Sequence, residues 1–341
     1  MNSALPGTSG GEIVLLKIAG MFLVMLAGWA AARRRVLGAE KTGVLSRLVV
    51  DLAFPALVFT QMLATVDPAR LRADLWISLY GLALIPFSLL AAMAVGRLRG
   101  AASDRRTFRF LVAVPNWVYL PLPIAEAMYG ADGTRFVLLC NIGAQLGLWT
   151  IGVFILTGRP LTRTSLSGLA MNPGLLAAVA GIAVACLWPM GRLLVLGAPP
   201  PDAGVLIKFC DVVVDAAQMI GSITIPLALL ITGAQLAGLS ASIVWPSLGV
   251  AGVLAGRMVV APILAMGLVH LGMFLSGVAL PDWARLTAYL IAAMPTGVTC
   301  VMFIERFGGD RDLGALGILY TTVASFLTVP VWVWVWHATG W

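Results

Sequence analysis

Charged side chains are what this sequence has least of. Asp, Glu, Lys and Arg together make up 11% of its 341 residues, whereas soluble chains carry roughly 25%. A soluble globule of this length would need more charged surface, so that class of protein is excluded. Hydrophobic residues reach 60% of the chain, and protein surface that faces lipid is apolar. The composition therefore predicts an integral membrane protein.

Histidine and cysteine are also scarce. The chain has 2 His and 4 Cys, the cysteines lie far apart in apolar surroundings, and no CxxC or Cys/His spacing occurs. Most protein zinc and iron–sulfur sites need such clustered ligands. No metal site and no cofactor are therefore predicted, and the cysteines are interpreted as small buried side chains.

Two classes of protein other than transporters remain alternatives. An intramembrane enzyme would need a nucleophile–base pair or a metal, and neither an HExxH motif nor a His/carboxylate pair appears in the sequence. A membrane-embedded sensor or receptor is disfavoured by short loops without a signalling domain. The formal net charge of +7 does not predict a nucleic-acid partner, because the basic residues lie in short loops between apolar runs.

Apolar runs of about 20 residues, the length that crosses a bilayer as a helix, recur along the whole chain. They predict an all-α membrane protein with ten transmembrane helices. The segments are 12–32, 43–64, 74–96, 108–130, 134–157, 173–196, 206–236, 244–276, 283–306 and 312–337.

Basic residues are concentrated in the odd-numbered loops of this scheme. By the positive-inside rule those loops face the cytoplasm, so both termini are expected to be extracytoplasmic and the chain to lie in the cell inner membrane. The residues are Arg33, Arg34, Arg35, Lys41, Arg47, Arg97, Arg99, Arg105, Arg106, Arg109, Arg159, Arg163, Arg306 and Arg311.

Three landmarks recur at nearly one offset. Pro55 and Pro226 are 171 residues apart, Pro115 and Pro295 are 180 apart, and two aspartates that follow the second pair are 178 apart. This predicts a duplication, with one five-helix repeat in residues 1–160 and another in 161–341. Because five is odd, the second repeat must be inverted in the membrane, as in many secondary transporters.

Prolines cluster inside the fourth and ninth segments. Pro115, Pro121 and Pro123 lie close to Asn116 in one, and the run Pro295, Thr296, Gly297 and Thr299 lies in the other. Each internal proline removes a backbone hydrogen bond, and in hydrocarbon the freed groups need protein or a wet cavity. We therefore predict two broken helices that cross near the bilayer centre. Simple proline kinks are the alternative.

Four polar residues inside predicted spans are candidates for function. Asp51 is a candidate site for a coupling Na⁺ or H⁺, or it lies near the cytoplasmic end and reaches water. Arg257 is a candidate for charge coupling to an anionic substrate or ion, or it snorkels to an interface. Asn141 and Gln145, four residues apart on one helix face, line the pathway or make interhelical hydrogen bonds.

Several stretches resemble the auxin efflux carrier family in motif, order and spacing. The strongest is VPNWVYLPLPIAEAMYG, which begins at Val114; FPALVF, MNPGLLAA, IPLALLITGAQL, AGRMVVAP and AAMPTGV follow the family's order. The chain departs from the plant members in its short central loop and in having Cys300 where their ninth helix has a proline. It looks like a compact bacterial member.

The resemblance implies two inverted five-helix repeats, similar to the bile acid/sodium symporter fold, with a scaffold part and a transport part. It implies a carrier for small organic anions such as malate, malonate or indole acids, and favours a homodimer in the bilayer. It places Asn116 at the substrate carboxylate and Gln145 nearby. The expected substrate site comprises Pro115, Asn116, Pro123, Asn141, Gln145, Pro295, Thr296, Thr299 and Cys300.

Overall fold

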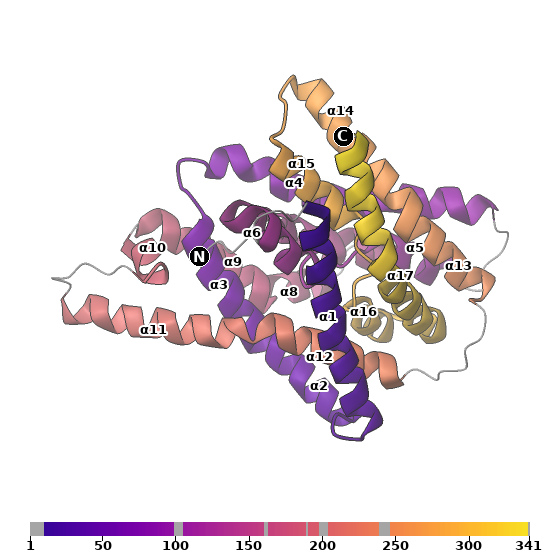
Figure 1. The fold of residues 1–341 in the computed structure, drawn as a ribbon, viewed down its shortest axis with the longest axis horizontal. Coiled ribbons are helices and arrows are strands. Elements are labelled where there is room, and N and C mark those ends of the chain that lie inside the picture. Colours follow the sequence, from indigo (N-terminus) through magenta and orange to yellow (C-terminus); the bar gives the residue numbers. More distant parts are fainter. Residues whose placement is uncertain are drawn as a thin grey trace.

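The computed structural model describes residues 10–98, 105–159, 163–188, 190–197, 204–238 and 246–339. Every regular element in these ranges is a helix, as predicted (Figure 1). The predicted boundary between repeats at residues 160 and 161 lies outside the described residues, as do both ends of the chain, whose sidedness was also predicted.

The first half of the chain forms helices that follow the predicted segments with shifted ends. Two of these helices continue directly into a short π-helical turn, and the backbone stays helical across each junction. The elements are α1 (Gly10–Arg33), α2 (Ala39–Leu48), η1 (Val49–Ala53), α3 (Phe54–Thr65), α4 (Leu71–Leu98), α5 (Arg105–Ala113), α6 (Pro121–Gly147), η2 (Leu148–Gly152) and α7 (Val153–Thr157).

The second half also contains long helices and shorter ones. A single residue joins α11 to α12, and a π-helical turn joins α13 to α14. The elements are α8 (Arg163–Ala170), α9 (Pro173–Leu187), α10 (Met190–Val195), α11 (Val205–Ser222), α12 (Thr224–Gly238), α13 (Leu248–Ala255), η3 (Gly256–Val260), α14 (Ala261–Ser276), α15 (Asp282–Ala292), α16 (Cys300–Phe307) and α17 (Arg311–Thr339).

Seven stretches of helix in the described residues are long and apolar enough to cross a bilayer, whereas the sequence predicted ten. The difference has physical causes. Helix α9 has only 15 residues, and interruptions leave α5, α15 and α16 with 9, 11 and 8 residues. Helix α6 runs through Gly130, whose φ of 56° and ψ of −134° bend the chain where the sequence predicted one span to end.

Glycine lets two pairs of helices approach closely. Helix α1 packs against α12, where Gly28 faces the backbone of Leu230 and Gly233 faces the backbone of Met25 (Figure 1). Helix α3 packs against α9, where Gly181 lies against the Phe59 carbonyl. Small residues at crossings are typical of membrane helices, because dispersion rather than the hydrophobic effect holds them together.

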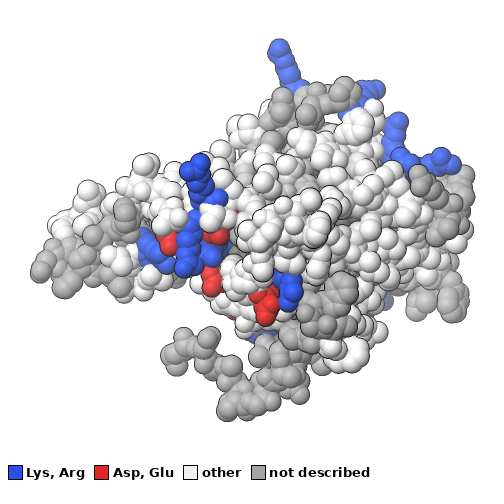
Figure 2. Space-filling model, turned by 90° about the horizontal axis from the view of Figure 1, so that it is seen from above, with Lys and Arg blue, Asp and Glu red and all other residues white. Residues whose placement is uncertain are grey.

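Large apolar side chains cover much of the outer surface. Leu23 is 67% exposed, Phe209 65%, Phe274 83% and Trp334 67%, and these four lie on four different helices. Charged side chains gather in a few places on the face seen in Figure 2, with wide uncharged areas between them. Such a surface suits lipid, so the structure agrees with a protein that spans the membrane several times.

Candidate functional site

Two helix interruptions meet inside the fold. The chain leaves α5 at Ala113 and resumes as α6, and it leaves α15 at Ala292 and resumes as α16. Between these ends, Pro115 and Thr296 form an antiparallel bridge. The Asn116 N–H donates to the Pro295 carbonyl at 2.7 Å, and the Gly297 N–H donates to the Val114 carbonyl at 3.0 Å. The predicted broken helices therefore exist, and the broken segments cross.

The crossing also pairs the backbone groups that the prolines set free. Pro115 has no N–H for the Leu111 carbonyl four residues before it, and the Thr296 hydroxyl donates to that carbonyl at 2.9 Å instead. The Thr296 N–H in turn donates to Thr321 Oγ1 at 3.3 Å. Thr296 is fully buried, and its hydroxyl and N–H both donate to protein groups that hold the crossing together.

A cavity of about 40 Å³ lies directly beside the crossing. It brings together five of the predicted site residues, namely Pro115 and Asn116 in the interruption after α5, the two amides on α6, and Thr299. Its walls are Phe54, Pro115, Asn116, Trp117, Val118, Tyr119, Asn141, Gln145, Gly297, Val298 and Thr299. The residues just before α6 and α16 line the cavity, so two helix N-termini with their partial positive charge adjoin it.

The amide of Asn141 has a fixed orientation in this cavity. Trp117 Nε1–H donates to Asn141 Oδ1 at 3.0 Å. An indole nitrogen can only donate, so the amide oxygen must face Trp117 and the amide nitrogen must face away from it. Asn141 is fully buried, and its Nδ2 has no hydrogen-bond partner. A buried donor without a partner is costly, which points to an acceptor supplied by a ligand.

The amide of Asn116 is fixed in the same way. Its Oδ1 accepts a hydrogen bond from the Tyr119 N–H at 3.1 Å. A backbone N–H can only donate, so this contact turns Nδ2 of Asn116 away from Tyr119. Asn116 is 7% exposed and lines the cavity. Each amide thus accepts one hydrogen bond that fixes its orientation and turns its NH₂ group away from that contact, and such donors suit an acceptor such as a carboxylate.

Two larger cavities open from the crossing. One, of about 420 Å³, shares Tyr119, Gln145 and Thr299 with the small cavity and extends to Arg306. The other, of about 790 Å³, shares Tyr119 and Thr299 and extends to Arg47. Both arginines belong to the loops that the basic residues predict to be cytoplasmic.

The remaining predicted residues lie away from the small cavity. Pro123 is the third residue of α6 and does not line it. Cys300 is fully buried at the start of α16, and Pro295 contributes its carbonyl to the crossing. Asp51 is exposed and lines the larger, 790 Å³ cavity. Arg257 is fully buried, so the interpretation that it snorkels to an interface is wrong.

Trp117 and Tyr119 are the site residues that sequence reasoning missed. Both follow Asn116 in the interrupted segment, and both help to set the orientation of an amide. Their position among the clustered prolines was a usable signal, because a segment that cannot be helical turns its backbone and side chains toward a cavity.

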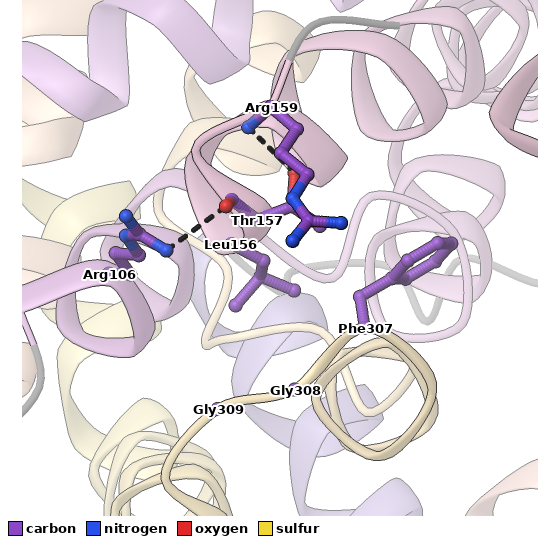
Figure 3. A pocket seen from close by; sticks show the side chains of 7 residues that line it. All are labelled: Arg106, Leu156, Thr157, Arg159, Phe307, Gly308 and Gly309. Atoms are coloured by element: carbon purple, nitrogen blue, oxygen red, sulfur yellow. Dashed lines mark hydrogen bonds between the residues drawn. The ribbon is translucent and has the colours of Figure 1, made fainter. Parts of the chain in front are cut away.

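A separate pocket lies at the end of α7, beside the loop after α16 (Figure 3). Arg106 Nη1–H donates to the Thr157 carbonyl at 3.0 Å, and the Arg159 N–H donates to the Thr157 hydroxyl at 3.1 Å. Gly308 and Gly309 form the opposite wall. This pocket shares no residue with the crossing cavity.

In the described part of the chain, no group of three or more His, Cys, Asp or Glu residues is placed to hold a metal.

Comparison with known proteins gives matches over nearly the whole chain. A sequence model of the family described as "Membrane transport protein" matches residues 13–164 and 159–333. A "Putative malonate transporter" of Rhizobium meliloti (strain 1021) is 24% identical over 316 residues, which cover 90% of this chain and 91% of that protein. An "Uncharacterized transporter" of Methanothermobacter thermautotrophicus is 22% identical over 330 residues, which cover 92% and 96%.

Proposed function

Because the chain belongs to the membrane transport protein family, we propose that it is a secondary transporter which binds a small organic anion at the crossing of its two interrupted helices. This family includes the auxin efflux carriers that its motifs resemble. Family membership favours transport over the two alternatives, a membrane-embedded sensor or receptor and an intramembrane enzyme.

The orientation of two amides, Asn116 and Asn141, is the main evidence that the ligand is an anion. Asn116 and Asn141 each have their oxygen hydrogen-bonded to an N–H, so their amide nitrogens are the groups turned away from those contacts, in a cavity that Gln145 and the Thr299 hydroxyl also line. Hydrogen bonds from such donors to a carboxylate are charge-assisted. A cation placed against these two amide nitrogens would be repelled by their hydrogens.

The proposed architecture is ten transmembrane helices in two inverted repeats. In this scheme α3 and α12 belong to corresponding helices, as do α9 and α1. The packing of α1 on α12 then corresponds to the packing of α9 on α3, which supports the inversion. Each repeat also contributes one interrupted helix to the crossing. Repeats of this kind exchange the open side of a midplane site by moving against each other.

The state that fits the structure best is open to the cytoplasm. Both large cavities lead from the crossing toward the basic loops. At the other end, Arg135 pairs with Asp74 on α4 at 3.4 Å and with Asp132 at 3.0 Å, and its guanidinium lies 5.8 Å from the ring centroid of Trp283 on α15. These contacts join three helices where the extracytoplasmic path would otherwise open.

Malonate is the first substrate to test, because the Rhizobium relative bears that name. We propose that the substrates are carboxylates, a class that includes malonate, malate and indole acids. We also propose that the protein forms a homodimer in the cell inner membrane. Cross-linking of the protein in native membranes would check the dimer.

Uptake by proteoliposomes tests the function directly. We expect the purified protein to take up radiolabelled malonate or a competing carboxylate, and ligand at 100 times its Kd to stabilise the protein by about 2.7 kcal/mol. Malonamide, which has the same skeleton without charge, is the matched control and should neither compete nor stabilise. If no carboxylate gives uptake or a thermal shift, the proposal is wrong.

Replacing Trp117 by phenylalanine should weaken anion binding about fivefold, because loss of one hydrogen bond of about 1 kcal/mol lets the Asn141 amide rotate. The measurement is the Kd for radiolabelled malonate. Trp76→Phe is the control: Trp76 packs edge-on against Phe136 outside the cavity, and its replacement should leave the Kd unchanged. Equal effects of the two substitutions would show that the Trp117 hydrogen bond is not what matters.

A further inference from the structure

Arg257 is a buried cation in an unusual position. It lies in the π-helical turn η3 and is fully buried. No Asp or Glu of the described residues forms an ion pair with it. A buried charge without a partner of opposite sign is very costly, so the structure must compensate for it in another way.

Backbone carbonyls at the crossing provide that compensation. Arg257 Nη1–H donates to the Val112 carbonyl at 2.9 Å and to Ser88 Oγ at 3.2 Å, and Nη2–H donates to the Ala292 carbonyl. Val112 is the next-to-last residue of α5, and Ala292 is the last residue of α15. One guanidinium therefore bridges the C-terminal ends of both half-helices.

Both carbonyls are free because of the breaks. In a continuous helix Val112 would accept from the Asn116 N–H and Ala292 from the Thr296 N–H, four residues later. At the crossing, those N–H groups donate to the Pro295 carbonyl and to Thr321 Oγ1 instead. The C-terminal ends of two helices carry partial negative charge, and in transporters with broken helices such ends bind the coupling cation.

We propose that Arg257 is a resident cation at the crossing, so that the carrier binds its anion without a co-bound Na⁺ at this place. The planar fork of the guanidinium presents separate N–H donors to the two carbonyls in one fixed geometry. Its positive charge lies at the C-terminal ends of α5 and α15, whereas the residues just before α6 and α16 line the proposed anion cavity. The assignment rests on the contacts of Arg257 itself, and only its effect on anion affinity rests on the proposed function.

Chemical rescue tests the assignment without any substrate. The Arg257→Gly variant should be less stable than the wild type and should gain about 3 °C in Tm from millimolar guanidinium, which can refill the vacated place. The wild type and the control Arg109→Gly, which removes an exposed arginine of α5, should gain nothing. Equal shifts in all three proteins, or no shift in Arg257→Gly, would overturn the assignment.

Ion replacement tests the consequence for binding. The wild-type Kd for radiolabelled malonate should change less than twofold when choline replaces Na⁺ at constant ionic strength, whereas Arg257→Gln should weaken binding at least tenfold with its chromatographic profile unchanged. A wild type that binds malonate only with Na⁺ contradicts the proposal, even if no Arg257 variant folds. A wild type that binds no carboxylate contradicts the proposed function, while the thermal measurement still decides the role of Arg257.

Discussion

Replacing Asn116 by aspartate should abolish anion binding while leaving the fold intact. The aspartate keeps an oxygen that can accept from the Tyr119 N–H, as Asn116 Oδ1 does at 3.1 Å. The amide donor is lost, and a negative charge takes its place, stabilised by the adjacent helix N-termini. A carboxylate ligand would then meet a carboxylate, so we expect the Kd for malonate to rise at least 100-fold, or roughly 3 kcal/mol.

Two further variants separate the donor from the charge and from stability. Asn116→Ala should raise the Kd about 10- to 100-fold, the usual value of one hydrogen bond to a charged group. Asn172→Ala is the matched control, because Asn172 lines the 420 Å³ cavity but not the small one, and caps α9 through a 2.9 Å hydrogen bond from the Leu175 N–H. It should cost about 1 kcal/mol of stability with little change in Kd.

The measurements are the Kd from radioligand binding and Tm for all three variants. If Asn116→Asp binds malonate as well as the wild type, Asn116 does not contact the carboxylate and the crossing cavity is not the anion site. A fall in Tm with unchanged Kd would assign Asn116 a role in the fold alone.

The broken helices were predictable because proline acts locally. Pro115 and Pro295 lack an N–H wherever they occur, so their clusters indicated an interruption without any knowledge of neighbours. The sequence also placed Asn116, Asn141 and Gln145 near the site, through their spacing and through the family's motifs. The crossing, with Pro115 paired to Thr296, is a tertiary contact that confirms the predicted interruptions, whereas the roles of the three amides stay predictions.

What the sequence could not reveal depends on contacts between distant residues. The orientation of Asn141 follows from a hydrogen bond across 24 positions, and the place of Arg257 follows from carbonyls 145 and 35 positions away. No local pattern distinguishes an arginine that snorkels from one that bridges two helix ends. The predicted count of ten spans differs from the seven long apolar stretches in the described residues partly because the helix bent at Gly130 is one continuous element.

Replacing Gly28 by alanine should destabilise the protein strongly. A Cβ atom at Gly28 would overlap the Leu230 carbonyl oxygen, and backbone atoms cannot move aside as a side chain can. Helices α1 and α12 would have to separate, at a cost of about 3 kcal/mol or roughly 5–10 °C in Tm. Gly20→Ala on the same helix is the matched control, because a Cβ there meets nothing within 4 Å. It should be neutral or stabilising, since alanine favours a helix by about 0.5–1 kcal/mol over glycine.

A double variant distinguishes helix separation from two local clashes. Gly233 lies on the other side of the same crossing, where a Cβ would overlap the Met25 carbonyl oxygen. Once one added methyl group has pushed α1 and α12 apart, the second finds the space already open. Gly28→Ala and Gly233→Ala should therefore combine to less than the sum of their separate effects, by 0.5 kcal/mol or more, about the coupling expected of residues in contact. Full additivity of the two Tm changes would mean that each clash relaxes locally. In that case the substitutions would not act by separating α1 from α12.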